Sequence, residues 1–162
     1  MTDQATINHA GKYLTFVLAE ESYGIPILKV KEIIGMMKIT EMPQMPSFMK
    51  GVVNLRDHII PIIDLRQKFA MPPADYTERT CIIVIEAERS EQQARTIGII
   101  VDGVSEVVNI KEEQIEPAPA FAKDNDNRYI LGMAKVDDDV KILLEIDKTL
   151  SSSEIKDLTE TI

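Results

Sequence analysis

The chain has 162 residues, of which 44% are hydrophobic and 28% charged, and its formal net charge is −9. This length and composition suit one globular domain with its own core, or two very small units that share one. The acidic balance and the lack of a strongly basic stretch argue against nucleic acid as a partner. No apolar run approaches the roughly 20 residues of a membrane span, and the N-terminus has no apolar signal region. We therefore expect a cytoplasmic protein without direct membrane insertion.

The first third of the chain is predicted to consist mainly of short strands. Residues 1–11 are polar and are expected to form a disordered tail. Alternating apolar residues predict strands over 12–18 and 23–27. The apolar spacing over 28–34 fits a helical turn as well as a strand, and both readings stay open. Residues 36–40 are predicted to form another strand, which two nearby prolines end.

The stretch Gly51–Leu65 is predicted to be a β-hairpin, because two apolar runs flank a polar tip at 54–58. Its arms should pack into a core, whereas Asn54, Arg56 and Asp57 should point outward at the turn. A single arginine on a rigid tip presents five donors in a fixed fork, so Arg56 is a candidate recognition residue. The alternative is an ordinary solvated turn charge.

The second half repeats this pattern of strands and turns. Residues 80–85 are continuously apolar and predict a buried strand, whereas the charged segment 86–95 is expected to be a loop. Strands are predicted on either side of an Asp-Gly pair within 96–108. A second hairpin is predicted around the aspartates at 137–139. Residues 151–162 should form a terminal helix with one modest apolar face.

An internal repeat relates the two halves of the chain. Gly24–Ile34 aligns without a gap on Gly98–Val108. Two further matches follow in the same order, Phe48–Gly51 on Tyr129–Gly132 and Ile62–Leu65 on Leu143–Ile146. Two copies of one small β-unit, roughly 12–70 and 79–147, would each offer about five short strands, which suits a small closed barrel. An apolar layer is expected between the two copies.

The repeat also separates residues that serve the fold from residues that serve a site. Glu32 recurs as Glu106 and should belong to the shared architecture. Arg56 does not recur, because Asp137 takes its place in the second copy. A residue that is absent from the equivalent turn is not needed to form that turn, which favours a recognition role for Arg56.

Residues that could carry catalysis or hold a metal are sparse. His9, His58 and Cys81 cannot form a metal site together, because the cysteine lies in the predicted buried strand. The segment Asp124–Arg128 is superficially similar to a calcium loop but lacks its glycine and its closing glutamate. We find no nucleophile with a base at motif spacing and no glycine-rich phosphate loop, and we predict no enzyme, no cofactor and no metal.

Five of the eight methionines fall between residues 36 and 49, interleaved with prolines. Methionine is an adaptable filler of irregular cores, which is one interpretation of this cluster. The other is a deformable apolar patch that docks a partner helix.

Several segments resemble the CheW family of chemotaxis coupling proteins. They are Tyr23–Ile33, Phe48–Arg56, Pro61–Arg66 and Val101–Val107, continued by Ile115–Pro119 and Tyr129–Gly132. The resemblance covers residues 12–150 as one CheW-like domain. It implies a mainly β fold of two small SH3-like five-stranded barrels side by side, with short helices and a C-terminal helix, and it leaves an exchange of strands between the barrels open.

The resemblance implies a non-enzymatic adaptor that couples the cytoplasmic hairpin tips of methyl-accepting chemoreceptors to the regulatory domain of the histidine kinase CheA, in membrane-bound arrays. The implied receptor site is the groove between the barrels. By family position the receptor-binding residues would be Arg56, Val30, Glu32, Ile27, Val104 and Val107. By the same comparison Gly51, Ile82 and Met36 would belong to the kinase-binding or partner interface.

Two questions stay open beside the resemblance. The family usually has glycine where this chain has Asp57, so a differently bent tip and a pairing of Asp57 with Arg56 both have to be considered. The alternative function is a small ligand-binding or enzymatic β-barrel protein unrelated to chemotaxis. The lack of convergent polar residues argues against that alternative.

Overall fold

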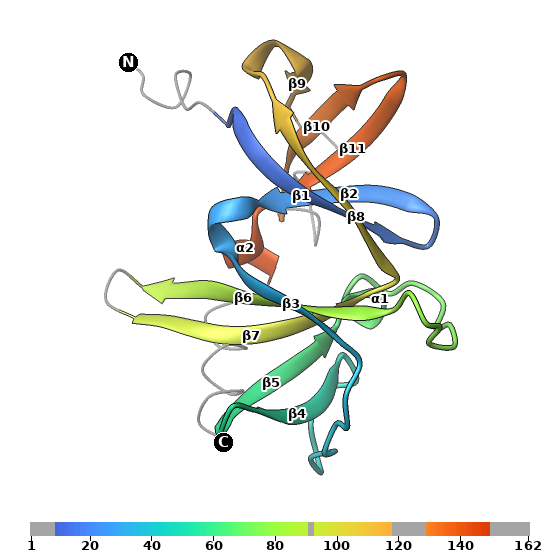
Figure 1. Cartoon of the computed structure of the whole chain (residues 1–162), viewed down its shortest axis with the longest axis vertical. Helices are drawn as coiled ribbons and strands as arrows, with labels where there is room; N and C mark the ends of the chain where they lie inside the picture. The colour runs from blue at the N-terminus through green and yellow to red at the C-terminus, as the bar shows by residue number, and fades with distance from the viewer. Residues whose placement is uncertain (1–8, 91–92, 118–128, 150–162) are drawn as a thin grey trace.

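Two β-sheets stacked one above the other make up most of the protein in the computed structural model, which describes residues 9–90, 93–117 and 129–149 (Figure 1). The six-stranded sheet contains β1 (Gly11–Leu18), β2 (Glu21–Pro26), β8 (Gly103–Ile110), β9 (Ile115–Glu116), β10 (Ile130–Val136) and β11 (Asp139–Leu144), in the order β8-β1-β2-β11-β10-β9. The five-stranded sheet contains β3 (Val30–Gly35), β4 (Met49–Leu55), β5 (His58–Asp64), β6 (Cys81–Ser90) and β7 (Gln93–Val101), in the order β3-β6-β7-β5-β4. The short helices are η2 (Ile27–Lys29), α1 (Leu65–Lys68), η3 (Glu112–Gln114) and α2 (Ile146–Thr149).

The mainly β fold with few helices is therefore confirmed, but the sheets do not follow the two halves of the sequence. The five-stranded sheet is built from residues 30–101, and the six-stranded sheet from residues 11–26 together with 103–144. The N-terminal hairpin has joined the later strands, as in the strand exchange that the resemblance left open. Among the described residues, no helix has the length and apolar character needed to cross a bilayer.

The strand pairing reproduces the internal repeat. β7 pairs in parallel with β5 so that Gly98 faces Ile62, and β2 pairs in parallel with β11 so that Gly24 faces Leu143. These are equivalent residues of the two copies. Both glycines leave room for the neighbouring aliphatic side chain, since an added Cβ would lie 2.6 Å from Ile62 Cδ1 at Gly98 and 3.2 Å from Leu143 Cδ2 at Gly24.

Three apolar clusters fill the protein, and the largest lies between the sheets. It takes buried side chains from β1 and β2 on one side and from β5, β6 and β7 on the other. Within β6, Ile83 and Ile85 face this layer, whereas Ile82 and Val84 face a second cluster within the five-stranded sheet. This burial on both faces explains why the segment is apolar without a break. An apolar layer is therefore present, but it lies between the two sheets and not between the two halves of the sequence, because the first hairpin has changed sheets.

Two local predictions are wrong, and one ambiguity is resolved. The charged segment 86–95 is not a loop, because β6 and β7 continue as a paired ladder, with Glu86 opposite Thr96 and Ala87 opposite Arg95. Residues 36–40 do not form a strand and contribute only an isolated bridge from Thr40 to Val52. Residues 27–35 comprise the short helix η2 followed by β3. The predicted terminal helix at 151–162 and most of the 1–11 tail lie outside the described residues, and β1 already begins at Gly11.

Candidate functional site

The tip of the predicted hairpin is a two-residue turn between β4 and β5. Arg56 and Asp57 occupy it with φ values of 51° and 69°, the pair of left-handed conformations that matches the twist of the flanking strands. Asp137 and Asp138 adopt φ values of 50° and 65° in the equivalent turn between β10 and β11. Aspartate tolerates this conformation better than most residues, so Asp57 completes a regular turn in place of the family's glycine.

Arg56 pairs with Glu32 of β3. Its Nη2 donates to Glu32 Oε1 at 2.8 Å, and its Nη1 donates to Oε2. The hydrogen bond from the guanidinium is the main cause that lowers the pKa of Glu32, and the same bond raises the pKa of Arg56. The Arg56 side chain nevertheless stays 69% exposed. A bidentate pair of this kind fixes the plane of the guanidinium while leaving donors free for a partner.

The Arg56–Glu32 pair joins the two opposite edges of the five-stranded sheet, since β3 and β4 are its outermost strands. The segment that follows β3 also reaches β4 in an isolated backbone bridge, in which Thr40 N donates to Val52 O at 2.8 Å and Val52 N to Thr40 O at 2.9 Å. The sheet must therefore curl until its edges meet, which is how a residue of β3 reaches the tip of the β4–β5 hairpin.

A groove of about 500 Å³ opens beside this pair. Its walls come from β3, from the β4–β5 hairpin and from the β6–β7 hairpin. The lining residues are Lys31, Glu32, Leu55, Arg56, His58, Ile59, Ile60, Pro61, Val84, Arg95 and Thr96. Ile60, Pro61 and Val84 are buried and form an apolar floor, whereas the charged residues stand at the rim. We call this feature the Arg56 groove. It combines an apolar floor with an arginine whose side chain is fixed by its ion pair with Glu32.

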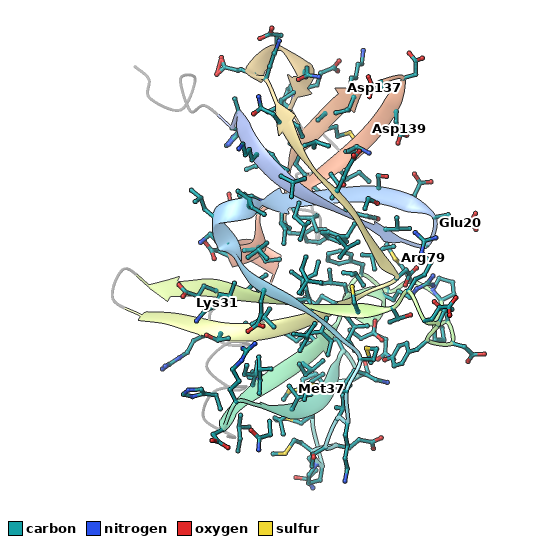
Figure 2. The ribbon with its side chains drawn as sticks, viewed as in Figure 1. Glu20, Lys31, Met37, Arg79, Asp137 and Asp139 are labelled. Atoms are coloured by element: carbon teal, nitrogen blue, oxygen red, sulfur yellow. The ribbon has the colours of Figure 1, made fainter. Side chains whose placement is uncertain are left out.

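Two lining residues show how the rim is arranged. Lys31 projects from β3 beside the β6–β7 hairpin and lies 3.6 Å from Glu86, measured from Nζ to Oε2 (Figure 2). Ile59 is 56% exposed although it lies in a strand. Ile59 was not among the site residues predicted from the sequence. The sequence feature that could have indicated it is an apolar residue directly beside His58, on the outward face of the hairpin.

Three of the other predicted receptor-site residues lie at the junction of the two sheets. Ile27, Val30 and Val104 are partly buried and pack against the cluster between the sheets. Val107 lies further along β8, opposite Leu14 of β1, and is 50% exposed. The structure therefore brings Arg56 and Glu32 into contact, and it places Ile27, Val30 and Val104 in or just after the two segments that connect one sheet with the other.

Leu28 is an exposed apolar residue at the same junction that was not among the predicted site residues. It lies in η2 directly after Ile27 and is 95% exposed. The repeat contains a signal for it, because its equivalent in the second copy is the charged residue Asp102. An apolar side chain that is held in water where the other copy has a charge is a candidate contact for a partner.

The predicted partner-interface residues Gly51, Ile82 and Met36 lie in the five-stranded sheet or directly after its strand β3. Ile82 is completely buried in the cluster within the five-stranded sheet, so its side chain does not reach the surface, and the prediction that it lies at a partner interface is corrected here. Met36 packs against the same cluster while partly buried. Gly51 has a φ of 144°, and a Cβ there would lie 2.1 Å from Thr40 O.

The methionine-rich segment serves mainly as core filler. Met49 is buried and Met45 partly buried in the layer between the sheets, whereas Met37 stands at the surface (Figure 2). Within the described residues, no three His, Cys, Asp or Glu side chains gather as they would around a metal ion. The calcium-like segment 124–128 lies outside those residues.

The comparisons with known proteins agree on one family. Residues 12–154 match the family model of the CheW-like domain. The chain is 45% identical over 144 residues to the chemotaxis protein CheW of Klebsiella aerogenes, which covers 89% of this chain and 84% of that protein. It is 33% identical over 141 residues to the probable chemotaxis protein CheW of Rhizobium etli, covering 87% of this chain and 88% of the relative.

A solved structure extends this agreement to the fold. The scaffolding protein TtCheW from Thermoanaerobacter tengcongensis superposes with a TM-score of 0.74 at 38% identity, and the match covers 83% of this chain and 88% of that one. The family model spans most of the chain, and both the curated relatives and the solved scaffold match it over nearly their whole length. The chain therefore belongs to the CheW family of chemotaxis scaffold proteins.

Proposed function

We propose that this protein is a non-enzymatic adaptor that couples the cytoplasmic tips of methyl-accepting chemoreceptors to the histidine kinase CheA. In this role it works in the cytoplasm and is recruited to membrane-bound receptor arrays. The proposal rests on family membership together with one structural observation. Arg56 is held by Glu32 at the rim of a groove with an apolar floor, at a turn that does not need an arginine.

The groove and the nearby crossovers suit a helical guest. A helical hairpin offers apolar side chains at intervals of three and four residues, which can pack on Ile59, Leu28 and Val107. Arg56 can bind a carboxylate or a backbone carbonyl of the guest through its outward donors. Ile27, Val30 and Val104 would support these contacts from beneath, since they are partly buried.

The kinase would use a different surface, because an adaptor has to hold both partners at once. Met36 and Gly51 are proposed to act there through the shape of the five-stranded sheet rather than through direct contact. Met37, the residue after Met36, is exposed and available to a partner.

The deciding experiment is kinase autophosphorylation with receptor fragments and the cognate CheA, with and without this protein. A large receptor-dependent change on adding the protein is expected. If both partners respond to another coupling protein but not to this one, the proposal is wrong. Incubation of the protein alone with candidate metabolites should give no turnover, and turnover would favour the alternative of an enzymatic β-barrel.

A further inference from the structure

The chain passes between the two sheets at two crossovers, and a short helix lies beside each of them. The first crossover is η2, which leads from β2 to β3, and the second is Asp102, the single residue between β7 and β8. Helix α1 lies at one side of the molecule and α2 at the other, both at the level between the sheets (Figure 1). The angle between the sheets depends on how these two connections are held.

At the second crossover, Arg66 of α1 binds Asp102. Arg66 Nε donates to Asp102 Oδ1 at 2.9 Å and Nη2 donates to Oδ2 at 2.6 Å. The same carboxylate accepts a hydrogen bond from the backbone N–H of Ala19, in the β1–β2 turn, at 2.8 Å. Asp102 thus ties a helix of the five-stranded unit to a turn of the six-stranded sheet. The two side chains are 17% and 30% exposed, so water screens this pair less than a surface pair.

At the first crossover, Lys29 of η2 binds Asp147 of α2. Lys29 Nζ lies 2.8 Å from Asp147 Oδ2, and the side chains are 23% and 25% exposed. Here the crossover leads into the five-stranded sheet and the helix follows β11 of the six-stranded sheet. This pair also ties the two units together.

Strand register explains why both pairs form. The parallel pairing puts Ile62 opposite Gly98, and four residues further along the chain, just past the ends of the two strands, stand Arg66 and Asp102. In the other parallel pair Leu143 lies opposite Gly24, and the same step leads to Asp147 and to Leu28, the residue before Lys29. Arg66 and Asp147 are therefore equivalent residues of opposite charge.

The charges of the two pairs are reversed. At the second crossover the helix supplies the cation and the crossover the anion, whereas at the first crossover the helix supplies the anion and Lys29 the cation. The position equivalent to Asp102 is then occupied by the exposed Leu28. An ion pair between the two copies thus forms at both crossovers, but from different residue types, which indicates that the ion pair itself is what matters.

The crossovers also carry or adjoin the aliphatic residues at the sheet junction. Ile27 and Val30 flank the Lys29 pair, and Val104 follows Asp102 by two residues. We propose that Lys29–Asp147 and Arg66–Asp102 are positioning clamps, which fix the angle between the sheets and so hold these side chains at the spacing that a receptor helix requires. The effect on receptor binding rests on the proposed function, whereas the effect on sheet angle does not.

The test reverses the Lys29 clamp to the polarity of its counterpart. Lys29→Glu and Asp147→Lys are made singly and together. Each single variant should weaken binding of a receptor hairpin fragment by about tenfold, and the double variant should recover to within about twofold of the parent. Lys135→Glu is the matched control, because Lys135 pairs with Glu116 at 3.2 Å within one sheet, and both side chains are over half exposed. It should leave binding unchanged.

Sheet angle is measured separately, by the distance between nitroxide labels at Lys12→Cys and Asn54→Cys in a Cys81→Ala background. Lys12 and Asn54 are exposed residues of different sheets. The parent should give one narrow distance, Lys29→Glu a shifted or broader one, and the double variant the parent's distance again. A lower unfolding temperature alone would change neither readout of the folded protein.

The outcomes separate the two claims. If the parent does not bind receptor fragments, the proposed function fails, and the label distances still test the clamp. Unchanged distances in Lys29→Glu overturn the clamp, as does a double variant that fails to recover. Changed distances with unchanged receptor affinity overturn the positioning role.

Discussion

The hairpins β4–β5 and β10–β11 have nearly the same backbone and different surfaces. Both contain a register shift at the equivalent glycine, Gly51 in one and Gly132 in the other. Both are fixed at their base by one backbone hydrogen bond, from Asp64 N to Phe48 O at 2.8 Å and from Glu145 N to Tyr129 O at 2.7 Å. Their turns have φ values that agree within 4°.

The side chains at the two tips differ in charge. Arg56 meets Glu32 in the first copy, whereas the equivalent residues of the second copy are Asp137 and Glu106, two acids that cannot form an ion pair with each other. Figure 2 shows Asp137 and Asp139 at the upper right of the molecule, at the outer end of the β10–β11 hairpin. The fold thus supplies two equivalent hairpin turns, of which the first carries an arginine and the second does not. The proposed recognition role of Arg56 rests on this difference. The predictions below test that separation of backbone from site.

Exchanging the charge at the first tip should have the largest effect on function. Arg56→Glu places two carboxylates where the ion pair stood, so receptor affinity should fall at least about tenfold and receptor control of the kinase should be lost. The unfolding midpoint should stay unchanged, because the side chain is exposed. Titration of receptor fragments and chemical denaturation measure the two effects. Asp137→Arg is the control and should change neither, and normal coupling by Arg56→Glu would remove Arg56 from the site.

Substitution of the glycine at each register shift, Gly51 or Gly132, should destabilise the fold to a different extent. Gly51→Ala requires a φ of 144° and puts a Cβ 2.1 Å from Thr40 O, so it should lower the free energy of unfolding by about 3 kcal/mol or more. At Gly132 the nearest atom, Glu116 O, is 2.9 Å away and φ is not in the left-handed region, so Gly132→Ala should cost about 1–2 kcal/mol. Denaturant titration checks both values. Equal costs would contradict a special role for the conformation of Gly51.

Gly98 and Gly24, the glycines of the two parallel strand pairs, should differ less in how much their substitution destabilises the fold. Gly98→Ala forces a Cβ to within 2.6 Å of Ile62 and 2.8 Å of Ile82, and should destabilise the fold by about 2 kcal/mol. Gly24→Ala meets only the flexible end of Leu143 at 3.2 Å and should cost under about 1 kcal/mol. Denaturation of both variants under the same conditions compares the packing of the two copies. The reverse order would mean that the six-stranded sheet is the tighter one.

Much of the fold could be predicted from the sequence, because its signals are local. Alternating apolar residues marked the strands, and the two hairpins were found from their polar tips. The internal repeat predicted an apolar layer to which both copies contribute. The exchange of the first hairpin was left open, because it depends on parallel pairing between residues far apart in the chain, such as Gly24 with Leu143.

The errors also have physical causes. The charged segment 86–95 was assigned to a loop, yet backbone pairing can continue past the end of the core where side chains no longer need to be apolar. Arg56 was identified because it breaks the repeat. Its partner Glu32 was predicted from family position only, and their contact requires the curl of the five-stranded sheet. The interface position of Ile82 came from the family resemblance, whereas the continuously apolar run 80–85 already predicted a buried strand, and Ile82 is completely buried.

A modest and pH-dependent effect is expected at the Arg66–Asp102 clamp, which joins the two copies. The hydrogen bond from Arg66 is the main cause that lowers the pKa of Asp102, and the bond from Ala19 N adds to it. A carboxyl whose pKa is lower in the folded state contributes stability above its unfolded value of 3.8, and that contribution is lost as the pH falls through the folded pKa. Asp102→Asn should therefore lower the free energy of unfolding by about 1 kcal/mol at pH 7, and this difference from the parent should disappear below about pH 3.8.

Urea titrations from pH 2 to pH 8 measure this difference in stability, with the exposed Glu113→Gln as a control that should change stability by less than about 0.5 kcal/mol. A gap that does not depend on pH would mean that Asp102 acts through its shape and its hydrogen bond from Ala19, and that the charge of the clamp contributes nothing.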